Sequence, residues 1–374
     1  MINFAVLGLS IFVYLIDNRY SQNKNKIATG RISTVFLSAL LFVMSAVRFE
    51  NVRLSDFAIN YLRVIQAKSM TWTECFTSGL AIGNAVIRKV IAEVFHDPQW
   101  YFIIAAFLVV YSVYHTTRLY SPNMFLTIFL FYTIGTYFTS NNITRQATAA
   151  AIILFSWKYI FNSDLIKYLL LVLLASTIHI SAIFFLPMYF LCRIKLGRNQ
   201  YIFYILLGIG LFLVRNPLIR FFRDLAFSNY TDTSYGTTGS SPLRLLLTIL
   251  VAIYLYIYSK NNDKIKPIIQ QTIPGGDPEL FYYFIGHSTV INIFLSVLSV
   301  TNMLLMSRLA MFWNFQSLIC ISYAVKSLKR KQMIWFIMLI VLAAILWFVI
   351  MEVTGKHIPT PYTPFWEFPD RSKI

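Results

Sequence analysis

Apolar runs separated by short polar breaks recur from one end of the chain to the other. A helix of about 20 apolar residues crosses the roughly 30 Å of bilayer hydrocarbon. Because backbone polar groups in a bilayer must be paired within the protein, such runs predict membrane helices. About twelve are expected, at approximately 2–17, 32–47, 99–116, 122–139, 145–161, 165–178, 179–193, 201–214, 243–259, 281–301, 308–325 and 333–351.

One further stretch, residues 75–95 ("CFTSGLAIGNAVIRKVIAEVF"), is interrupted by Arg88, Lys89 and Glu93, and small residues fill its first half. Charged groups at membrane depth are costly unless they face protein or water. We therefore expect a re-entrant or interfacial helix here rather than a crossing. If this stretch crossed the membrane instead, every later loop would lie on the opposite side of the membrane.

Composition indicates a membrane protein and excludes a soluble protein of this length. Of the 374 residues, 57% are apolar and 13% are charged, and the mean hydropathy is +0.64. A soluble core has a lower apolar fraction and more charge. We expect an all-α, polytopic membrane protein with a single transmembrane domain over 1–374, external loops at about 48–98 and 215–242, and an external C-terminal tail at about 352–374.

The ends of the chain carry two smaller expectations. The first apolar run has no basic leader and no small-residue cleavage site, so it predicts a retained helix. The tail "KHIPTPYTPFWEFPDRSKI" is rich in proline and aromatic residues. We expect this tail to fold over the outer face.

Motifs for metals, disulfides and nucleotides are absent from the sequence. The three cysteines, Cys75, Cys192 and Cys320, form no CxxC or CxxxC pair. HExxH, GxGxxG and GxxxxGK[ST] do not occur. We therefore expect no metal site, no nucleotide cofactor and no nucleic-acid partner.

Basic residues set the expected topology, because cytoplasmic loops of membrane proteins are enriched in lysine and arginine. With 75–95 outside the membrane, the cytoplasmic loops are "DNRYSQNKNK", "RLYSP", "KYIFNSDLIK", "CRIKLGR", "KNNDKIK" and "KSLKRK", and both termini are external. Of 15 lysines, 11 then lie on the cytoplasmic face, whereas 11 of 17 arginines lie outside. The external arginines are Arg48, Arg53, Arg63, Arg88, Arg145, Arg215, Arg220, Arg223, Arg244, Arg308 and Arg371.

This outward bias of arginine indicates an anionic ligand on the outer face. The planar guanidinium matches phosphate oxygens in bidentate fashion, so a phosphorylated ligand is implied. For any one arginine the alternative is contact with lipid headgroups or an external acid. Arg145 and Arg308 are the strongest candidates, because each begins a helix that continues as small or apolar residues, "RQATAAAII" and "RLAMFWNF".

His179 lies about midway through the apolar stretch 165–193, whose two ends both carry basic residues. If both ends are cytoplasmic, the stretch must be a hairpin of two short helices with its apex near His179. The histidine then lies on the same outer face as Arg145. The alternative for His179 is a packing role, and that is the role we expect for His115 and His287.

Two external segments carry further candidates. In residues 48–66, Asp56, Asn60 and Tyr61 are spaced so that a helix brings Asp56 and Asn60 onto one face, which suits a sugar. The loop 214–244 alternates arginines with aromatic residues and ends in a Gly/Ser/Thr-rich stretch. It predicts either a mobile lid or an amphipathic segment on the membrane surface, and it supplies Arg215, Arg220 and Arg223 as candidate binding residues.

Together these motifs resemble the EpsG family of Wzy-type polysaccharide polymerases. The resemblance rests on Asp56 and Tyr61 after the second helix, "NITRQATAA", "STIHISAIFFLP" and "SRLAMFW", and it covers about residues 30–325. Its most specific part is the pair Arg145 and His179.

The resemblance implies a bacterial inner-membrane glycosyltransferase of the C-type architecture, with its active site facing the periplasm. Its substrates would be undecaprenyl-diphosphate-linked oligosaccharide repeat units for O-antigen, capsule or exopolysaccharide. The growing chain would pass from its lipid diphosphate to the next lipid-linked unit, without a cofactor. Membrane lipids, a chain-length regulator and a flippase of the same pathway are the implied partners.

Roles follow from this chemistry. Arg145 would stabilise the negative charge that builds on the leaving diphosphate. His179 would protonate the diphosphate or accept the proton of the attacking hydroxyl, and Asp56 is the competing candidate for the base. The substrate-binding residues would be Arg308, Tyr61, Asn60, Arg215, Arg220 and Arg223.

Three alternatives have different sequence requirements. A lipid-linked oligosaccharide flippase should show internal repeats or paired broken helices, and we find no repeat. A membrane acyltransferase needs a cytoplasmic acyl-donor path, which the outward arginines disfavour. An O-antigen ligase shares the donor and differs only in the acceptor.

Overall fold

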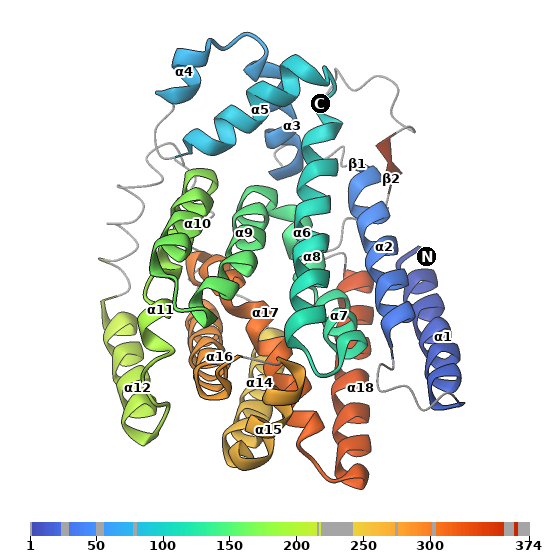
Figure 1. The fold of residues 1–374 in the computed structure, drawn as a ribbon. Coiled ribbons are helices and arrows are strands. Elements are labelled where there is room, and N and C mark those ends of the chain that lie inside the picture. Colours follow the sequence, from blue (N-terminus) through green and yellow to red (C-terminus); the bar gives the residue numbers. More distant parts are fainter. Residues whose placement is uncertain are drawn as a thin grey trace. The chain divides into compact units, whose positions relative to one another are not determined.

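The structure is a computed structural model that describes residues 2–23, 30–49, 56–77, 81–214, 217, 242–273, 276–300, 304–354 and 363–365. These residues are almost entirely helical (Figure 1). The predicted all-α class is confirmed. The described chain divides into two compact units, and each is described by itself.

Unit 1 comprises Met1–Pro187, Thr272–Gly276 and Ile334–Ile374. Its elements, most of which coincide with predicted apolar runs, are α1 (Ile2–Asn23), α2 (Arg31–Val47), β1 (Arg48–Phe49), α3 (Asp56–Ala67), α4 (Trp72–Phe76), α5 (Ile82–Val94), α6 (Gln99–Tyr120), α7 (Met124–Thr133), α8 (Thr136–Asn142), α9 (Thr144–Phe161), α10 (Leu165–Ile178), the 3-10 helix η1 (Ile180–Phe185), most of α18 (Arg330–Thr354) and β2 (Thr363–Pro364).

Short polar breaks between the apolar runs begin the helices of unit 1. The Asn123 side chain accepts from the Leu126 N–H at 3.1 Å and caps α7. Asp164 accepts from the Lys167 N–H at 3.1 Å and caps α10 in the same way. A side-chain oxygen at the N-cap pairs a backbone donor that has no partner within the helix.

The predicted helix at 122–139 is divided into α7 and α8 at Gly135. Gly135 has a φ of 88°, in the left-handed region that side chains rarely adopt. A Cβ at this position would lie 2.9 Å from the sulfur of Met351 on α18. The break therefore depends on glycine for both its backbone conformation and its close packing.

The stretch 75–95 is not one helix. Its elements are the end of α4, whose start is fixed by a capping box between Thr71 and Glu74, and the 13-residue α5. A helix of 13 residues is only about 20 Å long, too short to cross a membrane. Figure 1 shows α3, α4 and α5 gathered beyond the upper ends of α9 and α10.

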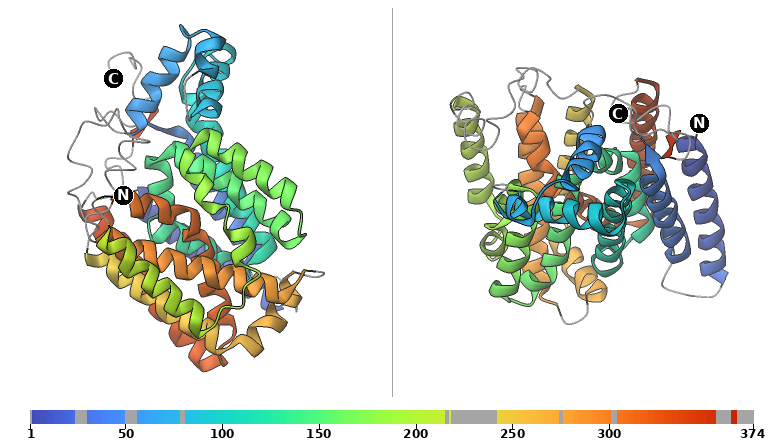
Figure 2. Two further views of the ribbon diagram at one scale, coloured as in Figure 1. Left: turned by 90° about the vertical axis from the view of Figure 1, so that its left-hand side faces the viewer. Right: turned by 90° about the horizontal axis from the view of Figure 1, so that it is seen from above.

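Unit 2 comprises Met188–Gln271 and Asp277–Met333. Its helices are α11 (Met188–Leu191), α12 (Arg198–Leu213), α14 (Pro242–Lys260), α15 (Asn262–Thr272), α16 (Pro278–Val300) and α17 (Leu304–Lys326). Helix α16 packs against α17, and α14 packs on both (Figure 2). The basic segment "KNNDKIK" was expected as a loop, but its first residue, Lys260, ends α14 and residues 262–266 begin α15, which bends by 91° from α14.

Among the described residues, three helices are long and apolar enough to cross a membrane: Gln99–Tyr120, Pro278–Ser299 and Arg330–Val353. A fourth crossing results if the bent pair α14 and α15 counts as one span. Several further apolar helices are shorter, among them α2 and α10, with 10 to 17 residues each. Twelve spans are therefore not confirmed, and this number stays a prediction.

The C-terminal segment returns to unit 1. Strand β2 pairs antiparallel with β1, with Arg48 opposite Pro364 and Phe49 opposite Thr363. Phe365 packs against the aromatic cluster beside Phe49. The tail thus covers residues next to the predicted site, and its place outside the membrane stays a prediction.

Candidate functional site

Arg145 is the second residue of α9 and is half-buried. The first turn of α9 contains no acidic residue, so the partial positive charge of the helix N-terminus adds to that of the guanidinium. The turn before α9 is fixed by the end of α2 and by β1. The Ser45 hydroxyl donates to the Asn141 side chain at 2.5 Å, and the Arg48 guanidinium donates to the Asn141 carbonyl. Arg145 is therefore held at a rigid, electropositive helix start.

His179 lies at the break between α10 and η1. The backbone N–H of His179 donates to the Ala175 carbonyl, and its ring Nδ1 accepts from the backbone N–H of Ser181 at 3.3 Å. The chain then turns back along α10, because the Tyr168 hydroxyl donates to the Phe185 carbonyl at 2.5 Å. The chain therefore reverses near His179, as predicted, but in place of the predicted second helix at 179–193 it forms the short 3-10 helix η1 and the four-residue segment Met188–Leu191.

The two residues are brought to one end of unit 1 by the pairing of α9 with α10. These helices are packed together and joined by the short turn 162–164, so they run antiparallel. The start of α9 and the end of α10 consequently lie at the same end, beside α5 (Figure 1). Gly83 on α5 approaches Thr177 on α10 so closely that a Cβ would lie 2.2 Å from the threonine hydroxyl.

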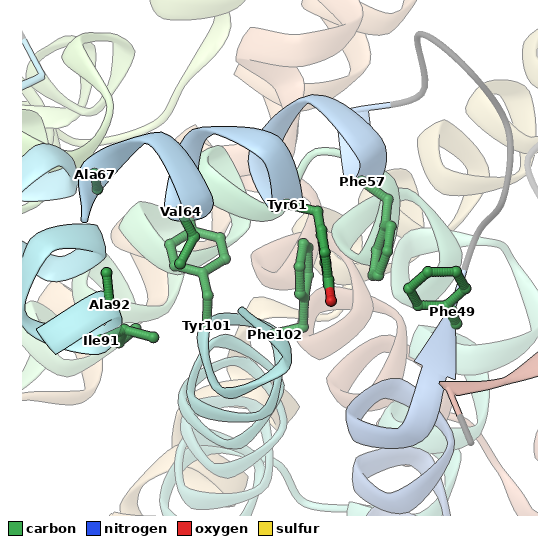
Figure 3. Packing of buried hydrophobic residues seen from close by; sticks show 9 residues of the cluster. All are labelled: Phe49, Phe57, Tyr61, Val64, Ala67, Ile91, Ala92, Tyr101 and Phe102. Carbon is green, nitrogen blue, oxygen red and sulfur yellow. The ribbon is translucent and has the colours of Figure 1, made fainter. Parts of the chain in front are cut away.

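An aromatic cluster fixes α3 above the start of α6 (Figure 3). The rings of Phe57 and Phe102 stack with centroids 4.0 Å apart, and Phe49 meets Phe57 edge-on at 5.5 Å. The Tyr61 ring stacks on the rings of Phe57 and Phe102, and the residue is only 3% exposed. Stacked and edge-on rings of this kind give α3 a defined rotation, which places its polar residues toward α5.

Arg88 on α5 is buried and hydrogen-bonded to neutral groups. It is 9% exposed, and its Nη2 donates to Asn60 Oδ1 at 2.9 Å. Asn84 lies one turn earlier on α5. In the amide orientation that gives both of its atoms a hydrogen bond, its oxygen accepts from Arg88 Nη2 at 2.6 Å and its nitrogen donates to the Tyr101 hydroxyl at 2.8 Å. Residues from α3, α5 and α6 therefore hold this guanidinium.

Arg63 and Arg145 lie near enough to act on Arg88 electrostatically. Burial, as the main cause, lowers the pKa of Arg88 to about 10; the two neighbouring guanidiniums lower it as well, whereas Tyr101 opposes the change. The side chain therefore stays protonated at neutral pH. We call Arg63, Arg88 and Arg145 the arginine cluster. Within the described part of the chain, Arg88 has no carboxylate partner.

The predicted residues of α3 take different places. Asp56 begins α3 and is half-buried. Asn60 donates to the Asp56 carbonyl at 2.6 Å and accepts from Arg88, so its amide supports the arginine cluster. The Tyr61 ring lies in the aromatic core. Sugar binding by these three residues stays a prediction.

The remaining predicted residues are Arg308 and three arginines of the loop 214–244, and substrate binding by these residues stays a prediction. Arg308 is half-buried near the start of α17 and belongs to unit 2. Arg215, Arg220 and Arg223 lie outside the described residues.

Sequence reasoning placed Arg63 and Arg88 only in the general set of external arginines. The signal that pointed to Arg88 was the charge inside "AVIRKVIAEV", which was interpreted only as an interruption of an apolar run. Its contact with Asn60, 28 residues earlier, depends on tertiary packing. Spacing along one helix cannot show such a contact.

The arrangement suits an anion rather than a metal ion. Arg88 donates to neutral amides, and the positive charges of Arg63 and Arg145 act on it, which is a setting that suits phosphate groups. In the ranges that the structure describes, no group of three or more His, Cys, Asp or Glu residues gathers as metal ligands do.

Comparison with known proteins gives one match. A family model described as the EpsG family matches residues 31–364, which is most of the chain and includes the whole arginine cluster. No curated protein and no solved structure matches.

Proposed function

Because the chain belongs to the EpsG family, a family of membrane proteins of polysaccharide biosynthesis, we propose that it is a repeat-unit polymerase. Its substrates are undecaprenyl-diphosphate-linked oligosaccharides, and it works at the periplasmic face of a bacterial inner membrane. It transfers the growing glycan from its lipid diphosphate to the next lipid-linked repeat unit of an O-antigen, capsule or exopolysaccharide.

The observation that carries this proposal is the shared location of Arg145 and His179. The α9–α10 hairpin brings a half-buried guanidinium at a helix start and an imidazole at a helix break to the same end of unit 1. Arg63 and Arg88 add positive charge at this end. A cationic site with an imidazole at the same end suits a reaction whose leaving group is a diphosphate.

In this reaction a hydroxyl of the acceptor sugar attacks the anomeric carbon of the donor. A new glycosidic C–O bond forms, the C–O bond to the diphosphate breaks, and its electron pair leaves with the diphosphate. The proton of the hydroxyl passes to His179 or to Asp56, the two candidate bases. No further reactant is required, because the diphosphate ester is already an activated donor.

Arg145 acts on the leaving group. As the bond breaks, negative charge builds on the bridging oxygen, and a preorganised donor aimed at such charge is worth about 3 kcal/mol, or roughly 100-fold in rate. The guanidinium is suited to this role because the fixed turn at Asn141 holds its helix start in place. Arg308 would bind the second lipid-linked substrate, as would Arg215, Arg220 and Arg223.

Apolar grooves are available for the polyprenyl tails. In unit 1 a groove of about 640 Å³ between α2 and α6 has Arg31 and Arg118 among its lining residues. In unit 2 a groove of about 470 Å³ lies between α12 and α16 and is lined almost wholly by apolar side chains. Grooves of this kind between helices suit long hydrocarbon chains.

The test is the surface-polysaccharide ladder, on gels, of cells that lack this gene. The cells are complemented at matched membrane levels with wild type, Arg145→Ala, His179→Ala or Lys158→Ala. Lys158 is an exposed residue at the opposite end of α9 and serves as the control. We expect the wild type and the control to restore the ladder, and Arg145→Ala to lower polymer about 100-fold or more.

The same gels separate the alternatives. Cells lacking a polymerase still attach at most one repeat unit. Loss of every repeat unit, including the first, would indicate a flippase or a ligase instead. An unchanged ladder would reject all three functions.

A further inference from the structure

Arg88 combines two properties that rarely occur together. Its guanidinium is buried at 9% exposure, and the groups that accept its hydrogen bonds are the neutral amides of Asn60 and Asn84. A buried charge is costly to maintain unless an opposite charge lies nearby. Among the described residues, the charged groups that act on it are further cations, Arg63 and Arg145.

The neighbouring residue shows that the fold can supply a carboxylate at this place. Lys89 is also buried, and its Nζ pairs with Glu93 at 2.9 Å one turn later and donates to the Lys68 carbonyl at 3.2 Å. The same turn of α5 therefore carries one cation with a carboxylate partner and one to which the described residues supply none. An unneutralised guanidinium on a rigid element leaves its charge available to a bound anion.

The two amides determine how Arg88 presents this charge. Asn60 is held by its own bond to the Asp56 carbonyl, and Asn84 by the Tyr101 hydroxyl. Together they occupy Nη2, and Asn84 also faces Nε at 3.3 Å. The Tyr101 hydroxyl also lies within hydrogen-bonding reach of the guanidinium. The described groups that hold Arg88 are therefore all neutral, and they leave its positive charge to attract an anion.

We propose that Arg88, oriented by Asn60 and Asn84, is the principal binding residue of a diphosphate site completed by Arg63 and Arg145. This inference rests on the proposed function for the identity of the substrate, a polyprenyl diphosphate. It adds a division of roles: Arg88 binds the diphosphate before transfer, Arg145 stabilises the charge that develops during transfer, and Asn60 and Asn84 are positioning residues.

The decisive variant is Asn84→Asp. The new carboxylate would accept from Arg88 and from the Tyr101 hydroxyl, so both existing contacts are kept while the positive charge is neutralised. For the purified full-length protein in lipid nanodiscs, we expect inorganic pyrophosphate to bind about tenfold or more weakly to Asn84→Asp than to wild type. The melting temperature should be equal or higher, because a buried charge gains its partner. A purely structural role for Asn84 predicts unchanged affinity.

Further variants set the limits. Arg88→Gln should bind pyrophosphate at least as weakly as Asn84→Asp, and Arg88→Lys should restore part of the affinity. Lys89→Gln is the matched control, on the same turn and also buried, and should bind within about twofold of wild type, because it removes a charge beside Arg88 but no contact of Arg88. Equal affinity of wild type, Asn84→Asp and Arg88→Gln would overturn the inference, and so would a wild type that binds neither pyrophosphate nor a polyprenyl diphosphate.

Failure of this inference can be told apart from failure of the proposed function. Pyrophosphate binding needs no acceptor sugar and no polymerisation. If pyrophosphate affinity depends on Arg88, the diphosphate site is supported even where the polysaccharide ladder shows that the protein is not a polymerase. Conversely, the polysaccharide ladder could require Arg145 while pyrophosphate affinity is unchanged in Arg88→Gln. That result would support the polymerase and reject the diphosphate site at Arg88. Comparing pyrophosphate with polyprenyl diphosphate shows whether the lipid adds affinity.

Discussion

The arginine cluster of unit 1 and the polar core around His287 in unit 2 both bury polar groups between helices, but they satisfy these groups differently. His287 is 1% exposed, its Nε2 lies 2.8 Å from the Ile194 carbonyl, and its Nδ1 lies 2.7 Å from the Tyr204 hydroxyl. Because a carbonyl can only accept, Nε2 carries the proton and Nδ1 accepts from Tyr204. Both ring nitrogens are therefore paired within the protein.

Arg88 shows the opposite arrangement, since its charge has neutral partners and cationic neighbours. A fully satisfied polar group rigidifies a core, whereas a buried charge without its counter-ion lowers stability and is kept where a ligand uses it. The comparison teaches that burial alone does not mark a site. What distinguishes the two regions is whether the described residues supply a partner for each polar or charged group.

Among variants that compare the two regions, the largest expected effect on polymer comes from a Gly→Ala substitution, which can be made in both regions. A Cβ at Gly83 would meet Thr177 at the end of α10, and a Cβ at Gly208 in unit 2 would lie 2.0 Å from the Phe294 ring. Both Gly83→Ala and Gly208→Ala should cost about 1–2 kcal/mol of stability. Only Gly83→Ala moves α5 relative to His179, so it alone should lower polymer by about tenfold or more at matched protein levels.

Gly210 provides the control for this pair, because a Cβ added there would have no neighbouring atom within 4 Å. Gly210→Ala should be neutral or stabilise the helix by about 0.5–1 kcal/mol. Melting temperatures and ladders of the three variants would be measured together. Equal loss of polymer in Gly83→Ala and Gly208→Ala would mean that the two regions do not differ in function.

Tyr204→Phe turns the satisfied region into an unsatisfied one. The variant removes the donor to His287 Nδ1 and leaves that nitrogen buried without a partner. We expect a loss of about 0.5–2 kcal/mol, seen as a lower melting temperature. The polymer ladder should keep its wild-type length distribution at matched levels. A shortened ladder with an unchanged melting temperature would instead assign His287 to the chemistry.

The positions of most helices could be predicted from the sequence, because an apolar run bounded by polar residues defines a membrane helix. The runs 145–161 and 165–178 agree with α9 and α10 to within a residue at each end. The break at Gly135 could not be predicted, since it depends on α18 packing against a glycine in the left-handed conformation. The helical start of α15 was missed because its charged residues were interpreted as a loop.

The site was predictable only where one residue stands out within its own segment. Arg145 does so at the head of an alanine-rich helix, and His179 does so within an apolar stretch. Arg88 does not, because its meaning depends on what surrounds it: amides from two helices, with no carboxylate from the described residues as its partner. Sequence spacing shows which residues share a helix face, but the partner of a buried charge is set by packing between helices.

The smallest expected effect comes from Glu93→Gln. This variant removes the carboxylate partner that Lys89 has and that the described residues do not supply to Arg88. Glu93 is 41% exposed on its side chain, so the lost ion pair should cost only about 0.5–1 kcal/mol despite the burial of Lys89. The freed ammonium adds positive charge next to Arg88, so pyrophosphate should bind as well as to wild type or up to about twofold more tightly. Calorimetric titration would measure this. Weaker binding would mean that Glu93 orients the anion site, and that a carboxylate partner does not mark a cation as structural.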